Sequence, residues 1–323
     1  FVWPITNPVN GAFMDEDGKW TFAFVAEVFR NPIYTEGLRN AFLLAVASTT
    51  LTILVALPLA FLSDRFDFAG KKLLSALLLV PMILPPFVGA IGVRQILSQY
   101  GALNAALWKL GLLAPGETID WLADGRFWGI VALNALHLYP ILFLNLTAAL
   151  ANVDPAMEEA AQNLGCTGLR KFRKITLPLI MPGLFAGGTI VFIFAFTELG
   201  VPLIFDYTRV SSVQIFYGIK EIAGNPFPFA LVVVMLAGTM LLYLASKLAF
   251  GRGEHAMMAK ATSAGGARTV GPLGSFLCVA VFGGITALAL LPHLGVICVS
   301  FAGDWYQSVL QSTWSLQHYE TAR

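Results

Sequence analysis

The sequence predicts an all-α protein, a polytopic bundle of transmembrane helices with about six spans. Of its 323 residues, 57% are hydrophobic and only 12% are charged, about half the charged fraction of a soluble domain. Apolar stretches of about 20 residues or more recur, and each is long enough to cross ~30 Å of hydrocarbon at ~1.5 Å per residue. Basic residues gather in three of the segments between these stretches. The predicted spans cover residues 40–62, 73–93, 127–150, 179–205, 228–250 and 274–301.

The chain opens with residues 1–39, which we interpret as the end of a truncated span followed by a periplasmic segment. A polar stretch at 10–19 leads to an amphipathic run that ends near Arg30 and is typical of a short interfacial helix. The first complete span, 40–62, then passes into a short polar turn at 64–72.

The second span, 73–93, contains Pro81, Pro85 and Pro86, which remove backbone hydrogen-bond donors in the middle of the membrane. The carbonyl groups freed in this way must be covered by other helices, by polar side chains or by water. We therefore expect this span to lie inside the bundle rather than facing lipid.

The third span, 127–150, follows an amphipathic connection at 101–126 that carries tryptophans suited to the membrane boundary. It is the span richest in polar and helix-breaking residues, namely Asn134, His137, Tyr139, Pro140 and Asn145. The fourth span, 179–205, contains Glu198 near its far end. The fifth, 228–250, is followed at 251–273 by a stretch rich in Gly, Ala, Ser and basic residues, which predicts a flexible linker.

Orientation follows from the distribution of Lys and Arg. The turn at 64–72 and the segments 151–178 and 247–272 together hold 11 of the 20 basic residues. The positive-inside rule places these three segments in the cytoplasm. The predicted spans then alternate in direction without a violation.

Residues 151–178 form the most distinctive segment between spans. Pro155 to Leu164 is predicted to form a short amphipathic helix, with Asp154 accepting hydrogen bonds from its first free N–H groups. Gly165 is placed to end that helix. A basic rim follows, made of Arg170, Lys171, Arg173 and Lys174.

The spacing within this segment is specific. Glu159-Ala160-Ala161 is followed after three residues by Gly165 and after nine more by Ile175-Thr176-Leu177-Pro178. This resembles the EAA loop of the inner-membrane permease subunits of binding-protein-dependent ABC importers, and every fixed position of that pattern is met. The resemblance implies a MetI-like permease fold in which 151–178 is the cytoplasmic loop that docks on an ATPase. The implied coupling residues are Glu158, Glu159, Ala160, Ala161, Gly165, Ile175, Leu177 and Pro178, with both glutamates facing the partner, the alanines permitting close approach and the glycine setting the turn.

The same resemblance implies a transport subunit rather than an enzyme. No G-x-x-x-x-G-K-[ST] motif is present, so ATP and Mg are expected on a separate cytoplasmic ATPase dimer and no cofactor on this chain. The other implied partners are a periplasmic substrate-binding protein, a second permease half, either fused or homologous, and membrane lipid. Three scattered cysteines predict no metal site, and the lack of a basic block predicts no nucleic-acid partner. The implied location is the bacterial inner membrane, crossed several times.

Candidate residues of the translocation path are Glu198, His137 and Tyr139. An ionised carboxylate at a helix centre costs about 2.5–3.5 kcal/mol on the insertion scale, so Glu198 requires compensation or a function. The run Glu198-Leu199-Gly200-Val201-Pro202 resembles iron(III)-type permeases, which implies ferric iron as the substrate. Importers for polyamines, phosphonate, thiamine and sulfate share the loop and remain alternatives. A secondary transporter driven by an ion gradient would require carboxylates in several spans, and we find one.

The tail repeats an earlier feature of the chain. Trp314-Ser315-Leu316 resembles Trp20-Thr21-Phe22 in type, and each run follows an apolar stretch and a polar loop. We therefore expect residues 40–250 to form a first permease domain and 251–273 a cytoplasmic linker. Residues 274–323 would then be the first span and the periplasmic start of a second, truncated permease repeat, as in the fused iron(III)-type permeases.

Overall fold

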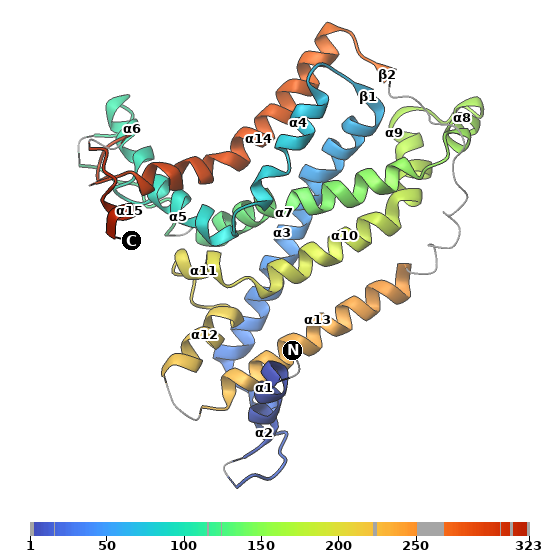
Figure 1. The fold of residues 1–323 in the computed structure, drawn as a ribbon. Coiled ribbons are helices and arrows are strands. Elements are labelled where there is room, and N and C mark those ends of the chain that lie inside the picture. Colours follow the sequence, from blue (N-terminus) through green and yellow to red (C-terminus); the bar gives the residue numbers. More distant parts are fainter. Residues whose placement is uncertain are drawn as a thin grey trace. The chain divides into compact units, whose positions relative to one another are not determined.

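The computed structural model describes residues 3–15, 17–114, 116–123, 125–221, 225–250, 268–303, 305–310 and 313–321 (Figure 1). These residues are mostly helical, which confirms the predicted fold class. The chain divides into two compact units. The first comprises Phe1–Phe66, Ile141–Leu199 and Thr208–Arg268, and the second comprises Asp67–Pro140, Gly200–Tyr207 and Thr269–Arg323.

Among the described residues, five helical segments are long and apolar enough to cross a membrane, and a bent pair of helices makes a sixth candidate. This agrees with the predicted number of spans. The five are α3 (Pro32–Arg65), α7 (Arg126–Ala151), the segment Gly168–Ile204, α13 (Phe227–Phe250, counted to Leu248) and α14 (Pro272–Ser300).

The second predicted span is broken rather than continuous. Residues 73–93 fall in α4 (Lys71–Leu77), a 3₁₀ turn (Val80–Met82) and the first part of α5 (Pro86–Leu97). Helix α6 (Ala102–Lys109), from the predicted connection, extends the second half of the bent pair, and the two halves are bent by 91°. Pro85 causes the bend, because the following Pro86 keeps it in an extended conformation with φ −58° and ψ 147°. Ile83, which lies within the break, is 75% exposed, so the described residues of this chain do not cover it, whereas the span was expected to lie inside the bundle.

Close helix packing organises the first unit. Helix α10 (Leu177–Thr197) packs along α3 and approaches the part of α7 that belongs to this unit. A Cβ atom added to Gly183 would lie 2.5 Å from the Cβ of Ala149, and one added to Gly187 would lie 2.7 Å from a methyl of Leu142. Only glycine permits this approach, as expected for small residues at the interfaces of membrane helices.

The remaining helices of the first unit surround α13. They are α1 (Trp3–Phe13), α2 (Ala23–Arg30) and α12 (Ser211–Glu221). Ala12, Val28, Ala230 and Leu231 are fully buried where α1, α2 and α13 meet. The start of the chain thus packs on the fifth predicted span.

In the second unit α5 packs against α14. The contact is between backbones, because a Cβ atom on Gly92 would lie 2.1 Å from the carbonyl oxygen of Pro292. Two short strands, β1 (Phe66–Asp67) and β2 (Arg268–Thr269), pair with each other. Of the predicted linker, residues 251–267 lie outside the described residues, whereas its last part forms β2 and the start of α14.

The two tryptophan turns noted in the sequence have the same local structure. Trp20 forms an antiparallel bridge with Met14, and the N–H of Thr21 donates to the carbonyl of Phe13 at 2.8 Å. The hydroxyl of Thr21 then accepts the N–H of Ala23 at 3.1 Å, where α2 begins.

In the second unit Trp314 bridges to Ala302, and the N–H of Ser315 donates to the carbonyl of Phe301 at 2.9 Å. The hydroxyl of Ser315 accepts the N–H of Gln317 at 3.1 Å, where α15 (Gln317–Thr321) begins. The two turns therefore share both backbone pairings and the side-chain cap. The permease repeat inferred from them remains a prediction.

Candidate functional site

Helix α8 (Pro155–Asn163) forms where the sequence predicted it and begins as predicted. The Oδ1 atom of Asp154 accepts the N–H of Ala156 at 2.9 Å, and Pro155 occupies the first turn, where its missing N–H costs nothing.

The end of α8 is set by glycine. Gly165 has φ +77°, its N–H donates to the carbonyl of Gln162 at 2.9 Å, and the N–H of Cys166 donates to the carbonyl of Ala161 at 2.8 Å. This pair of bonds is the Schellman arrangement, which satisfies the last free carbonyl groups of a helix. A Cβ atom on Gly165 would meet nothing within 4 Å, so the backbone conformation alone requires glycine.

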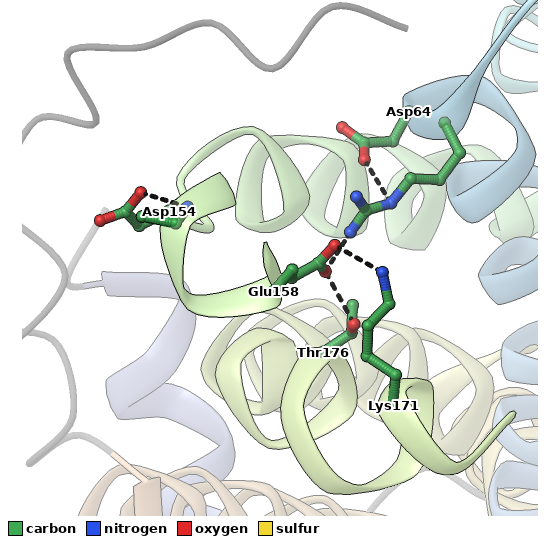
Figure 2. A network of polar contacts seen from close by, with 7 residues as sticks. Asp64, Asp154, Glu158, Lys171 and Thr176 are labelled. Atoms are coloured by element: carbon green, nitrogen blue, oxygen red, sulfur yellow. Dashed lines mark hydrogen bonds and ion pairs between the residues drawn. The ribbon is translucent and has the colours of Figure 1, made fainter. Parts of the chain in front are cut away.

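Glu158 is the centre of a polar network in the first unit (Figure 2). Its side chain is only 4% exposed. One carboxylate oxygen accepts from the guanidinium of Arg65 and, at 2.8 Å, from the hydroxyl of Thr176. The other accepts from the ammonium of Lys171 at 3.2 Å. These donors come from the end of α3, from α9 (Gly168–Lys171) and from the π-helical turn η2 (Phe172–Thr176).

The charge of Glu158 is held by these neighbours. Burial acts to raise the pKa of the carboxyl group. The hydrogen bonds from Arg65, Thr176 and Lys171 and the charge of Arg65 outweigh burial, so the pKa lies below its ordinary value. Glu158 is therefore ionised at neutral pH, in the form that can pair with both basic residues.

Arg65 is braced on two further sides. Its Nε atom lies 3.3 Å from a carboxylate oxygen of Asp64, and its guanidinium lies 5.7 Å from the ring centre of Phe61. The ring of Phe61 in turn meets that of Phe172 edge to face, with centres 5.4 Å apart. An ionic contact and an aromatic contact thus join the end of α3 to the loop that carries α8.

The π-helical turn supplies two of these contacts. At its end the N–H of Leu177 donates to the carbonyl of Phe172, one residue further back than in an α-helix. The turn carries both Phe172, which packs on Phe61, and Thr176, which donates to Glu158. Single π turns within helices are frequent at functional sites.

The outer surface of α8 differs from this inner side. Glu159 and Ala160 are exposed. Large apolar side chains are exposed beside them, with Met157 at 51%, Leu164 at 87% and Leu169 at 72%. Exposed apolar groups next to charges are typical of a protein interaction surface.

The structure separates the predicted coupling residues into two groups. Glu158, which was expected to face a partner protein, is instead buried against Arg65 and Lys171, and its role in coupling stays a prediction. Ala161 is also buried, at 7% exposed, whereas Ala160 is exposed. The last residues of the loop lead into α10, with Ile175 and Leu177 half-buried and Pro178 exposed.

Glu198 lies at a break between helices of the predicted fourth span. Helix α10 ends at Thr197, and Glu198 is half-buried with extended backbone angles, φ −61° and ψ 125°. Its carbonyl accepts the hydroxyl of Ser212 at 2.6 Å. The short helix α11 (Gly200–Ile204) follows in the second unit. Both helices lie within the candidate span Gly168–Ile204, which overlaps the predicted fourth span, 179–205.

Tyr139 has a packing role in the second unit. It is fully buried, and its hydroxyl donates to the carbonyl of Leu78 at 2.8 Å. In an α-helix that carbonyl would accept from Met82, whose N–H instead donates to Leu79. Tyr139 therefore covers a carbonyl that the proline-rich break leaves without a helical partner, and its place in the translocation path stays a prediction.

His137 lines a small cavity of about 10 Å³, enough for one water molecule, beside Pro85 and Pro86. His293 of α14 lines the same cavity and was missed from the sequence. Glu198 belongs to the first unit and His137 to the second, so the structure describes no joint site for them.

A second polar cluster in the second unit was also missed. Arg94 donates to the carbonyl of Ile204 at 2.9 Å and pairs with the carboxylate of Asp206 at 3.1 Å, and Arg126 donates to the Asp206 carbonyl at 3.2 Å. Asp206 has φ +54°, a conformation rare for a residue other than glycine. The arginines line a cavity of about 140 Å³ together with Asp120.

Comparison with known proteins identifies the family. The family described as "Binding-protein-dependent transport system inner membrane component" matches residues 48–253, more than half of the chain. The chain belongs to this family. It is therefore an ABC importer permease subunit, a multi-pass component of the inner membrane, as the loop at 151–178 predicted.

Three relatives illustrate the range of the family. The sulfate transport system permease protein CysT of Salmonella typhimurium is 29% identical over 67% of this chain and 76% of its own length. The molybdenum transport system permease protein ModB of Escherichia coli is 28% identical over 67% and 94%. The spermidine/putrescine permease protein PotB of Haemophilus influenzae is 28% identical over 56% and 63%. These relatives do not support the expected likeness to iron(III)-type permeases in particular.

Solved structures support the fold. A bacterial ABC transporter that imports the acidic polysaccharide alginate matches with a TM-score of 0.57 at 20% identity, over 76% of this chain and 90% of that one. The same kind of transporter in complex with a periplasmic protein bound to an alginate pentasaccharide matches with a TM-score of 0.59 at 18% identity, over 80% and 90%.

Proposed function

We propose that this permease forms the substrate path of an ATP-driven importer and couples to a separate cytoplasmic ATPase through α8. The observation that carries the proposal is the two-sided construction of α8. Its inner side is fixed by the charges around Glu158, while Glu159 and Ala160 are left exposed beside Met157 and Leu164. A short helix held in this way transmits a push or pull without deforming.

The mechanism follows from this construction. ATP binding closes the two ATPase subunits, each moves the coupling helix docked on it, and the spans rock between inward-open and outward-open states. ATP and Mg bind to the ATPase, and this chain holds no cofactor. A second permease half, fused or homologous, completes the path, and a periplasmic binding protein delivers the substrate. Complexes of the alginate importer include such a periplasmic protein.

For the substrate we propose a small oxyanion such as sulfate, in place of the ferric iron predicted from Glu198 to Pro202. Relatives named for sulfate and for molybdenum each align with two thirds of this chain, which supports the sulfate alternative already raised by the sequence. The relative named for spermidine and putrescine keeps polyamines as the competing class. Membership of the ABC importer family removes the reason to consider a secondary transporter.

The coupling proposal is tested by purifying the full-length protein with its ATPase and comparing Glu159→Lys with Asp17→Lys. Both side chains are exposed acids, and Asp17 lies far from α8 in the sequence. We expect Glu159→Lys to reduce ATPase co-purification and ATP hydrolysis at least tenfold, and Asp17→Lys to change neither. Unchanged association in Glu159→Lys refutes docking through α8.

The substrate proposal needs a separate measurement. Cells that express the complete transporter would be assayed for uptake of labelled sulfate, molybdate, ferric iron and spermidine, with a hydrolysis-deficient ATPase as the control. ATP-dependent uptake of sulfate or molybdate is expected. Uptake of ferric iron or spermidine alone would overturn the oxyanion assignment and leave the coupling proposal intact.

A further inference from the structure

The network around Glu158 joins α8 to segments that are connected to it in two ways, either directly along the chain or only by a non-covalent contact. Lys171 and Thr176 belong to the same stretch of chain as α8, and this stretch continues directly into α10. Helix α10 therefore follows α8 through covalent connection. Arg65 lies 93 residues before Glu158, at the last position of α3. Helix α3 has no such covalent route, so its link to α8 must be a contact.

We propose that Arg65 is a positioning residue that makes α3 move with α8, so that docking of the ATPase and the response of the membrane helices are separable at the Arg65–Glu158 pair. This rests on the proposed docking of an ATPase on α8. Arg65 suits the role because one guanidinium reaches the Glu158 carboxylate through its Nη atom and the Asp64 carboxylate through Nε. The contact with Glu158 is a hydrogen bond and that with Asp64 is an ion pair, and one extended guanidinium makes both.

Burial and an aromatic contact stabilise the Arg65–Glu158 ion pair. The side chain of Glu158 is 4% exposed and that of Arg65 is 29% exposed, so water competes weakly for either charge. The face of Phe61 lies under the guanidinium and packs on Phe172 of the loop, so an aromatic contact supports the ionic one. Opening the pair would leave a buried carboxylate with fewer donors, which is strongly unfavourable.

The opposite end of α3 reaches the segment around Glu198. The side chain of Asn40 donates to the carbonyl of Arg209 at 2.7 Å, and the carbonyl of Ile33 accepts from Gln214 at 2.9 Å. Between these two partners lies Ser212, whose hydroxyl donates to the carbonyl of Glu198. All of these residues belong to the first unit. Helix α3, which is one helix with Pro58 inside it, thus has the α8 network at one end and contacts next to Glu198 at the other.

The test uses the full-length protein with its ATPase in lipid nanodiscs. The native cysteines, which include Cys166, Cys278 and Cys298, are replaced by Ser. Thr197→Cys is introduced as a reporter, because Thr197 is exposed at the end of α10 next to Glu198. The rate of maleimide labelling is measured with and without ATP and vanadate. ATPase co-purification and thermal unfolding are measured on the same samples.

We expect Arg65→Gln to keep the ATPase and its hydrolysis but to reduce the ATP-dependent change in labelling at least fivefold. Exposed Arg170→Gln is the matched control and should respond like the parent protein. The double variant Arg65→Gln with Glu158→Gln removes both charges, so it should regain much of the thermal stability that either single variant loses. A positioning role predicts that the double variant still fails to respond.

Three results would overturn the inference. The first is an unchanged labelling response in Arg65→Gln, and the second is recovery of both the response and the stability in the double variant. The third is loss of the ATPase from Arg65→Gln, because this would show that Arg65 supports docking itself. Failure of the underlying proposal looks different. In that case Glu159→Lys keeps the ATPase bound, whatever Arg65→Gln does.

Discussion

Replacing Glu158 by Gln tests how firmly the loop is held, because it removes the charge and almost no volume. The ammonium of Lys171 and the guanidinium of Arg65 lose their counter-charge. The new amide N–H₂ group is itself a donor and faces groups that also donate. Breaking a fully buried pair costs about 3–5 kcal/mol, and an exposed pair is worth about 0–1 kcal/mol. Since Lys171 is 18% and Arg65 29% exposed, we expect a loss of about 2–3 kcal/mol.

This loss should appear as local opening of the loop. Trypsin cleaves after Arg170, Arg173 and Lys174, all of which follow α8. Where cleavage follows the population of the open form, a loss of about 2–3 kcal/mol raises the cleavage rate about 30- to 150-fold. Inside-out vesicles expose this loop to the protease, and cleavage is followed by mass spectrometry.

Glu159→Gln is the matched control for this experiment, because it makes the same chemical change at the next residue, where the side chain is exposed. A change of less than about 0.5 kcal/mol, or about twofold in rate, is expected there. If the two variants are cleaved at equal rates, the inward placement of Glu158 is wrong.

Three further predictions concern other parts of the structure. Gly165→Ala should destabilise the end of α8 by about 1–2 kcal/mol, because alanine is strained at φ +77°; the same cleavage assay measures it. The folded-state pKa of Glu158 is depressed, so its stabilising effect is present above the ordinary value of 4.5 and is lost as pH falls through the folded-state pKa. Cleavage by an acid-active protease should therefore rise at low pH in the parent protein and much less in Glu158→Gln. Tyr139→Phe should lower thermal stability by about 1–3 kcal/mol, because the buried carbonyl of Leu78 loses its donor, and should leave transport unchanged in a vesicle uptake assay.

The site has consequences for how the motif is interpreted. The adjacent glutamates of the loop have opposite surroundings, since Glu158 pairs within the chain and Glu159 is exposed. Substitutions at the two positions should therefore separate stability of the loop from binding of its partner. A variant that disrupts both at once would need an effect on the helix as a whole, such as loss of the Asp154 cap or of the turn at Gly165.

Local features were determined by the sequence alone. Apolar length predicts the spans because the hydrocarbon core sets a minimum length for any helix that crosses it. The ends of α8 were likewise predictable, since Asp154 and Gly165 act on backbone groups within a few residues of themselves. The spacing around Glu159 was sufficient to indicate the family.

Only the tertiary structure decided how distant parts of the chain are used. Neighbouring residues on a helix point about 100° apart, so the letters of the motif do not say which glutamate faces inward. That choice depends on Arg65, which is 93 residues away at the end of α3. The 91° bend after Met82 depends on whether the carbonyl groups left free at the break find partners, and Tyr139 is the partner of one of them, that of Leu78. The physical reason is common to these cases: burial and pairing of a charge or a carbonyl depend on what the folded chain brings beside it, which no local pattern contains.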